Sequence, residues 1–72
     1  MKVKINKVIN NGLNAYLHVP LKDFEGTYDT IQKELIRLES IYLNSEICAE
    51  WDQFDDHLYF YSTGNVYIEK VQ

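Results

Sequence analysis

Hydrophobic and polar residues alternate along several short segments of the chain and follow a helical period in one longer segment. The alternating segments include "KVKINKVI", "LNAYLHV" and "EICAEWDQF", and their period of two predicts β-strands. Between residues 27 and 43 the period is helical, with Thr27 as a candidate N-cap. The apolar stripe of this helix consists of Tyr28, Ile31, Leu35, Leu38 and Tyr42. The order of elements predicts a small single α+β domain over residues 1–72, β-β-α-β-β-β, with one helix packed on one face of a mostly antiparallel sheet.

Two glycines predict the loops of two β-hairpins. Gly12 in Asn10-Asn11-Gly12 and Gly64 in Ser62-Thr63-Gly64 each suit the positive-φ position of a bulged three-residue loop. The strand after the first loop is expected to end at Pro20, with the segment that follows linking it to the helix. The first loop then pairs Val3 with Val19, Ile5 with Leu17 and Ile9 with Leu13.

The second loop sorts the C-terminal side chains between two faces. It places Leu58, Phe60, Val66 and Ile68 in the core and turns the neighbouring tyrosines away from the helix. A tight turn at Asp55-Asp56 predicts that Trp51 lies opposite Phe60 in the core. On the outer face the same register sets Asp52 beside Tyr59 and Glu50 beside Tyr61.

Length and composition narrow the classes of function. A domain of 72 residues has little room for a deep catalytic cleft, and a hydrophobic fraction of 46% argues against disorder. The single cysteine, Cys48, cannot form an internal disulfide, and the first residues do not resemble a secretion signal. We therefore expect a soluble cytoplasmic protein without a membrane span.

The formal net charge of −4 argues against direct binding to nucleic acid. The acidic residues concentrate in "EICAEWDQFDD", which contains no lysine or arginine. Such a segment complements a basic surface, for example that of a nucleic-acid-binding protein. Charged side chains also commonly protect the edges of solvated sheets from aggregation, which is the alternative interpretation.

The outer sheet face is the candidate protein-binding site. Exposed aromatic residues next to acidic ones are typical of protein interfaces, although cross-strand tyrosines also stabilise sheets that face only water. His18, His57 and Glu69 are predicted on the same face. The candidate site residues are Tyr16, Tyr59, Tyr61, Tyr67, Glu50 and Asp52.

We predict no enzymatic activity, no catalytic residues, no cofactor and no metal. Asp55-Asp56-His57 is a cluster of potential metal ligands, but turn chemistry explains the two aspartates and no known metal motif is present. Cys48 has no basic neighbour in its own strand to activate it as a nucleophile.

The sequence therefore predicts a small acidic protein-binding module that offers its tyrosine-rich face to a larger basic protein. In size and charge the chain resembles the inhibitors that phages encode, including anti-CRISPR, anti-restriction and DNA-mimic proteins. That resemblance rests on no motif and assigns no residue. The alternative is a structural module or homodimer that associates through Ile36 and Leu43 or through a free strand edge.

Overall fold

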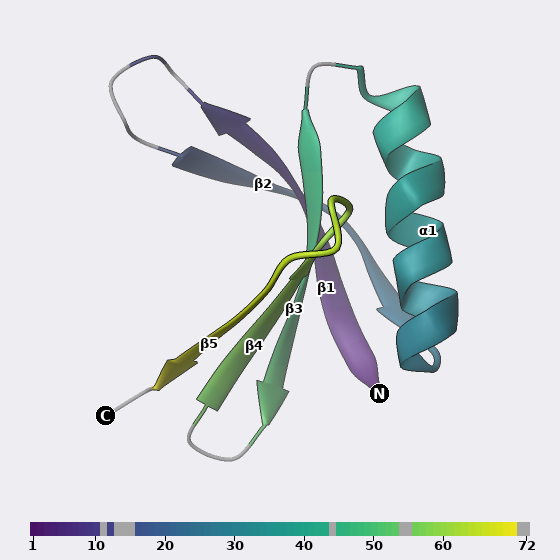
Figure 1. Ribbon diagram of the computed structural model, residues 1–72, viewed down its shortest axis with the longest axis vertical. Helices are drawn as coiled ribbons and strands as arrows, with labels where there is room; N and C mark the ends of the chain where they lie inside the picture. Colours follow the sequence, from purple (N-terminus) through teal and green to yellow (C-terminus); the bar gives the residue numbers. More distant parts are fainter. Residues whose placement is uncertain (11, 13–15, 44, 54–55, 71–72) are drawn as a thin grey trace.

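The chain folds into a curled five-stranded antiparallel sheet with one helix against it (Figure 1). The computed structural model describes residues 1–10, 12, 16–43, 45–53 and 56–70. The elements are β1 (Lys2–Asn10), β2 (Tyr16–Glu25), α1 (Tyr28–Ile41), β3 (Glu46–Gln53), β4 (Asp56–Tyr61) and β5 (Val66–Lys70). The strand order in the sheet is β2-β1-β3-β4-β5, so β2 and β5 form its two edges. The predicted fold class and element order are confirmed.

The predicted helix and its cap are confirmed. Thr27 precedes the helix with extended backbone, and its side chain accepts a hydrogen bond from the Thr30 backbone N–H. Asp29 lies in the first turn, where the helix dipole favours a negative charge. The helix buries Ile31, Leu35 and Leu38 and leaves Ile36 exposed, as its periodicity predicts. Within the described chain α1 is the only helix, and it is too short and too polar to cross a membrane.

The main core lies between α1 and the strands β1, β3 and β4. Its sheet residues are Val3, Ile5, Ile47, Ala49 and Phe60, all of them buried. Trp51 and Leu58 pack at the rim of this cluster and are only partly buried.

The second hairpin has the predicted register. Gly64 has φ +92°, and Phe60 pairs with Val66, Leu58 with Ile68 and Tyr59 with Tyr67. The core placement of Val66 and Ile68 is wrong, because they are 44% and 65% exposed. Their side chains do point toward the helix side, but β5 is an edge strand and α1 packs against β3 and β4.

The first hairpin keeps its predicted glycine but not its register. Gly12 has φ +85°, while Ile9 pairs with Leu17 and Val3 pairs with Phe24. Ile9 therefore pairs four positions beyond its predicted partner, and Val3 five positions beyond, because the register shifts between Ile5 and Asn6. Leu13 lies outside the described residues. The shift of four leaves Leu17 on its predicted face.

Pro20 does not end the second strand, which continues to Glu25. The register shifts between Ile5 and Asn6, so Leu21 is an extra residue next to the proline. A proline is tolerated here because β2 is an edge strand, where a missing backbone N–H need not interrupt pairing.

The predicted pairing of β3 with β4 is also shifted, by two positions. Trp51 lies opposite Leu58, and Ala49 lies opposite Phe60. Asp56 belongs to β4 rather than to the turn, and Asp55 lies outside the described residues. The small side chain of Ala49 leaves room for the Phe60 ring beneath the helix, which a tryptophan at that position would fill.

Candidate protein-binding face

All six predicted site residues lie on the side of the sheet opposite α1, which we call the helix-free face. Alternation along each strand turns them away from the core, and their cross-strand partners share this face. The corrected register of β3 and β4 pairs Glu50 with Tyr59 and Asp52 with His57. The six residues form two groups, one around Tyr16 and one around Tyr59.

The first group surrounds a hollow of about 280 Å³, which we call the tyrosine hollow. Tyr16 lies on one edge strand and Tyr67 on the other, so both edges of the curled sheet contribute to it. The rings of Tyr61 and Tyr67 meet edge to face, with 5.5 Å between their centroids. The lining residues are Val8, Tyr16, His18, Glu46, Tyr61, Asn65 and Tyr67.

The second group, which we call the histidine–carboxylate cluster, consists of Glu50, Asp52, His57 and Tyr59. His57 Nδ1 lies 2.8 Å from Asp52 Oδ1 and 3.7 Å from Glu50 Oε1. Its contact with Asp52 has the distance of an ion pair but not the geometry of a hydrogen bond. The Tyr59 hydroxyl donates to Glu50 Oε1 over 3.5 Å, and the His57 and Tyr59 rings are stacked.

The environment of Tyr59 is negative as well as partly buried. Burial and the nearby carboxylates of Glu50 and Glu69 raise the pKa of Tyr59 to about 12. The hydroxyl therefore remains protonated at neutral pH and available as a hydrogen-bond donor.

A second, smaller buried layer lies beneath the aromatic rings of the helix-free face. Cys48 is 0% exposed and Asn6 is 5% exposed, although no helix covers them. The rings of His18 and Tyr59 approach to 6.4 Å between centroids, whereas their strands would be about 14 Å apart in a flat sheet. The sheet therefore curls until side chains from β2 and β4 cover the smaller residues of β1 and β3. In Figure 1 the β1–β2 hairpin and the far ends of β4 and β5 both lean away from α1, consistent with this curl.

Cys48 has a basic neighbour that its own strand does not supply. His18 Nδ1 and Asn6 Nδ2 each lie 3.9 Å from Cys48 Sγ. Burial nevertheless raises the pKa of the Cys48 thiol to about 11. The thiol is thus mainly protonated at neutral pH, in a position suited to packing.

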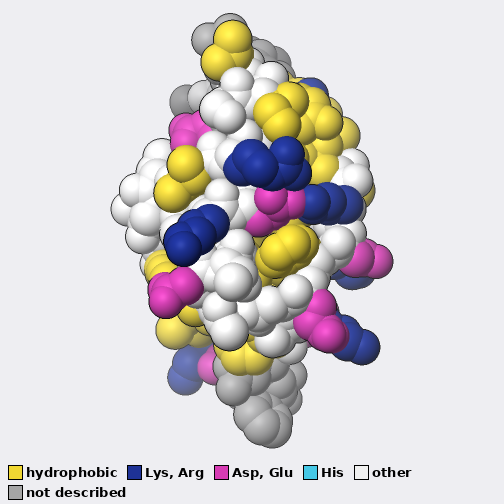
Figure 2. Space-filling model, turned by 90° about the vertical axis from the view of Figure 1, so that its right-hand side faces the viewer, with side chains coloured by type: hydrophobic (Ala, Val, Ile, Leu, Met, Phe, Trp, Pro, Cys, Tyr) yellow, Lys and Arg dark blue, Asp and Glu magenta, His cyan; other side chains and the backbone are white. Residues whose placement is uncertain are grey.

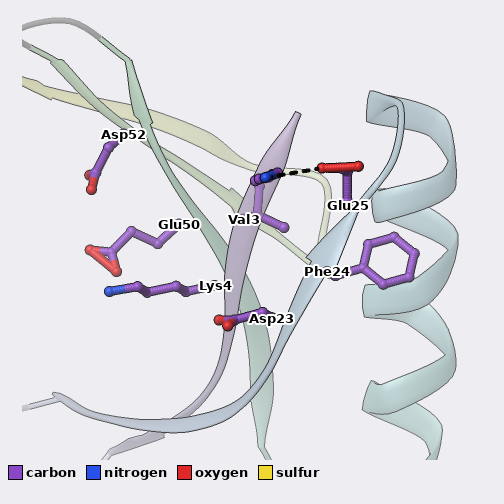
Figure 3. A pocket seen from close by; sticks show the side chains of 8 residues that line it. Val3, Lys4, Asp23, Phe24, Glu25, Glu50 and Asp52 are labelled. Atoms are coloured by element: carbon purple, nitrogen blue, oxygen red, sulfur yellow. Dashed lines mark ion pairs between the residues drawn. The ribbon is translucent and has the colours of Figure 1, made fainter.

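A larger groove, of about 570 Å³, lies at the other end of the molecule and is lined by both basic and acidic side chains (Figure 3). Lys4 and Glu50 are cross-strand neighbours whose side chains extend in the same direction (Figure 3). Lys2 Nζ lies 3.8 Å from Glu25 Oε2. Two lysines lie among four carboxylates in the lining of this groove, whereas no lysine or arginine lines the tyrosine hollow.

The two sides of the sheet differ in how their charges are arranged. On the helix side, lysine and arginine side chains alternate with acidic ones (Figure 2). There Glu34 accepts hydrogen bonds from Arg37 Nε at 2.6 Å and Nη2 at 3.0 Å and forms an ion pair with Lys22. The helix-free face gathers carboxylates from β3 and β5, namely Glu46, Glu50, Asp52 and Glu69, and carries Lys4 beside Glu50.

The structure changes the candidate metal ligands without establishing a metal site. His57 joins Glu50 and Asp52, with one ligand atom of each within 4.8 Å of the others, whereas the sequence had suggested Asp55 and Asp56. A hard cation takes six or more oxygen ligands, and Asp52 is well exposed. We therefore treat these side chains as part of the acidic surface.

Glu46 and His18 belong to the tyrosine hollow but are missing from the predicted site. The sequence predicts the outer face for His18, and Glu46 falls in the acidic segment. Their role depends on the pairing of β1 with both β2 and β3, which joins segments distant in the sequence.

Comparison with known proteins yields no match to a family model, a curated protein or a solved structure. The functional interpretation therefore rests on the geometry of the side chains.

Proposed function

We propose that this domain is a protein-binding module whose helix-free face docks on a basic surface of a larger protein. The observation that carries the proposal is the joining of tyrosine rings and carboxylates on one face, with the bases mainly elsewhere. Tyr16 and Tyr67 are 65% and 59% exposed, so their rings are available to a partner. Tyrosine supplies stiff contact area and a hydroxyl, and both favour binding at interfaces.

The acidic side chains of this face suit a partner whose surface is basic. Glu50 and Asp52 lie beside Tyr59 and His57, where their field would guide a basic partner toward the rings. If the partner uses that basic surface to bind nucleic acid, docking blocks it, and the module acts as an inhibitor of the type that phages encode.

The test begins with affinity capture by the wild-type domain and mass spectrometry of the retained proteins. Association and dissociation rates are then measured for each candidate, with E50Q/D52N compared with the matched helix-side variant D29N/E39Q. Both variants remove two negative charges, so a general charge effect changes both equally. We expect E50Q/D52N to slow association about tenfold at low salt and to flatten its salt dependence. Equal rates for the two variants would refute docking through this face.

A second candidate function, self-association, is favoured by the exposed edge strand β5. All five described residues of this strand are exposed, including Val66 and Ile68, and its outer edge has no partner strand in the described chain. Light scattering across a concentration series distinguishes the two functions. A monomer at all concentrations argues against self-association, whereas a dimer that V66K/I68K disrupts supports it.

A further inference from the structure

We propose that the tyrosine hollow binds the side chain of an arginine, which the basic partner inserts between Tyr16, Tyr61 and Tyr67. This inference rests on the proposed function and names the chemical group that the face recognises. It concerns a hollow separate from the histidine–carboxylate cluster.

The size and walls of the hollow suit a single long side chain. Its volume of about 280 Å³ is slightly below the range for pockets that hold small molecules, about 300–1,000 Å³. Val8, which is 6% exposed, contributes an apolar surface, and the tyrosines contribute aromatic ones. The edge-to-face contact of Tyr61 and Tyr67 fixes two of these rings at an angle of 87°. An aliphatic stem and a flat cationic end both find contacts in such a site.

The charge in the hollow selects a cation. Glu46 supplies a carboxylate, and it forms no ion pair with a lysine, arginine or histidine in the described part of the chain. Glu46 Oε1 accepts a hydrogen bond from Thr63 Oγ1 at 3.0 Å, which orients the carboxylate without neutralising it. The negative charge of Glu46 also contributes to a raised pKa of Tyr61, after the larger effect of burial.

Several carboxylates of the molecule lie next to basic side chains, whereas Glu46 lies among tyrosine rings in the hollow. Glu34 is held by Lys22 and Arg37, Glu25 by Lys2, and Glu50 and Asp52 by His57. In the larger groove, Lys2 and Lys4 lie among the carboxylates, so the chain supplies its own cations there. The tyrosine hollow contains no lysine or arginine among the residues that line it.

Arginine fits these features better than lysine does. Its guanidinium is flat, stacks on aromatic rings and is less strongly hydrated than an ammonium group. Its several N–H donors can meet the Glu46 carboxylate and the tyrosine hydroxyl oxygens together. Asn65 Nδ2 donates a hydrogen bond to Thr63 Oγ1 at 3.2 Å, which leaves the side-chain oxygen of Asn65 as a further acceptor.

The test uses N-acetyl-arginine amide as a probe in NMR titrations of the isotope-labelled domain. N-acetyl-citrulline amide, which has nearly the same shape but no charge, is the control ligand. We expect saturable shifts at Val8, Tyr16, Glu46, Tyr61 and Tyr67 with the arginine probe and much weaker binding of the citrulline probe. Weaker binding of N-acetyl-lysine amide than of the arginine probe is expected as well.

Variants show whether Glu46 and the rings act as proposed. Glu46→Gln should raise the Kd for the arginine probe about tenfold, and Tyr67→Ala about threefold. Glu39→Gln, on α1, removes the same charge from the opposite side of the sheet and should leave the Kd unchanged. Equal binding of the arginine and citrulline probes, or equal effects of Glu46→Gln and Glu39→Gln, would overturn the proposal. The probe titration needs no partner, so its failure leaves the rate measurements with the captured protein as an independent test of the proposed function.

Discussion

The two faces of the sheet both bury side chains completely, but by different means. On the helix side, α1 covers an aliphatic cluster that includes Ile5, Ile47 and Phe60, all 0% exposed. On the helix-free face, the rings of His18 and Tyr59 cover Cys48, and a polar residue, Asn6, is included in the buried layer. A helix covers the buried residues on the helix side, whereas individual side chains cover those on the helix-free face.

This difference indicates how stability and binding are divided in the molecule. On the helix-free face, His18 lies against the buried Cys48, whereas Tyr16 and Tyr67 are mostly exposed. A partner can therefore contact these two tyrosine rings directly. We expect changes beneath the helix to affect mainly folding and changes in the rings to affect mainly binding.

The largest effect is expected at Phe60, the central aromatic residue of the helix side. Its ring is 0% exposed and packs against Tyr28 with 4.8 Å between centroids. Phe60→Ala should lower the free energy of unfolding by about 3–5 kcal/mol, because it leaves a cavity beneath the helix. Urea denaturation measures this change. A loss below about 1 kcal/mol would show that the main core lies elsewhere.

Tyr59→Ala is expected to affect binding more than folding. Loss of a central aromatic anchor should weaken binding of the captured partner by about 2 kcal/mol of binding free energy. The same change uncovers Cys48, so the thiol should react several-fold faster with a disulfide reagent. Tyr42→Ala, on the helix side, is the control and should change neither measurement. Partner binding by Tyr59→Ala at the wild-type level would contradict an anchor role for this ring.

The alternation pattern predicted the faces well and the pairings less well. Gly64 and the residues around it specify the second hairpin locally, and this hairpin has the predicted register. The pairing of β1 with β2 depends on the length of the loop between Asn10 and Tyr16 and on the bulge beside Pro20, and no local pattern reveals either feature. The exposure of Val66 and Ile68 depends on how far α1 reaches across the sheet. The tyrosine hollow depends on the curl that brings both edges together, which also lies beyond local sequence.

Gly64→Ala tests the hairpin that sets the order of tyrosines on the helix-free face. Gly64 has φ +92°, and a β-carbon there would meet no atom within 4 Å, so the cost comes from the backbone alone. We expect a loss of about 1 kcal/mol in the free energy of unfolding. A thermal or urea unfolding curve that matches the wild type would contradict the positive-φ loop.

A smaller effect is expected from the paired charges of the helix side at acid pH. Contacts with Arg37 and Lys22 lower the pKa of Glu34 from 4.5 to about 2. Ionised Glu34 therefore stabilises the fold above pH 4.5, and this contribution is lost as the pH falls toward 2. This contribution to the free energy of unfolding should be about 1 kcal/mol or less, because water screens the charges of Lys22 and Arg37, whose side chains are 38% and 56% exposed. Glu34→Gln should remove this part of the acid dependence, and identical pH profiles for the variant and the wild type would contradict it.

Docking through the helix-free face, and not through the helix side, is tested most directly by NMR of the labelled domain with and without the captured protein. We expect signal changes at Glu50, Asp52, Tyr59, Tyr61 and Tyr67, with Ile36 and Glu39 on α1 unchanged. Changes confined to α1, or to the outer edge of β5, would contradict it.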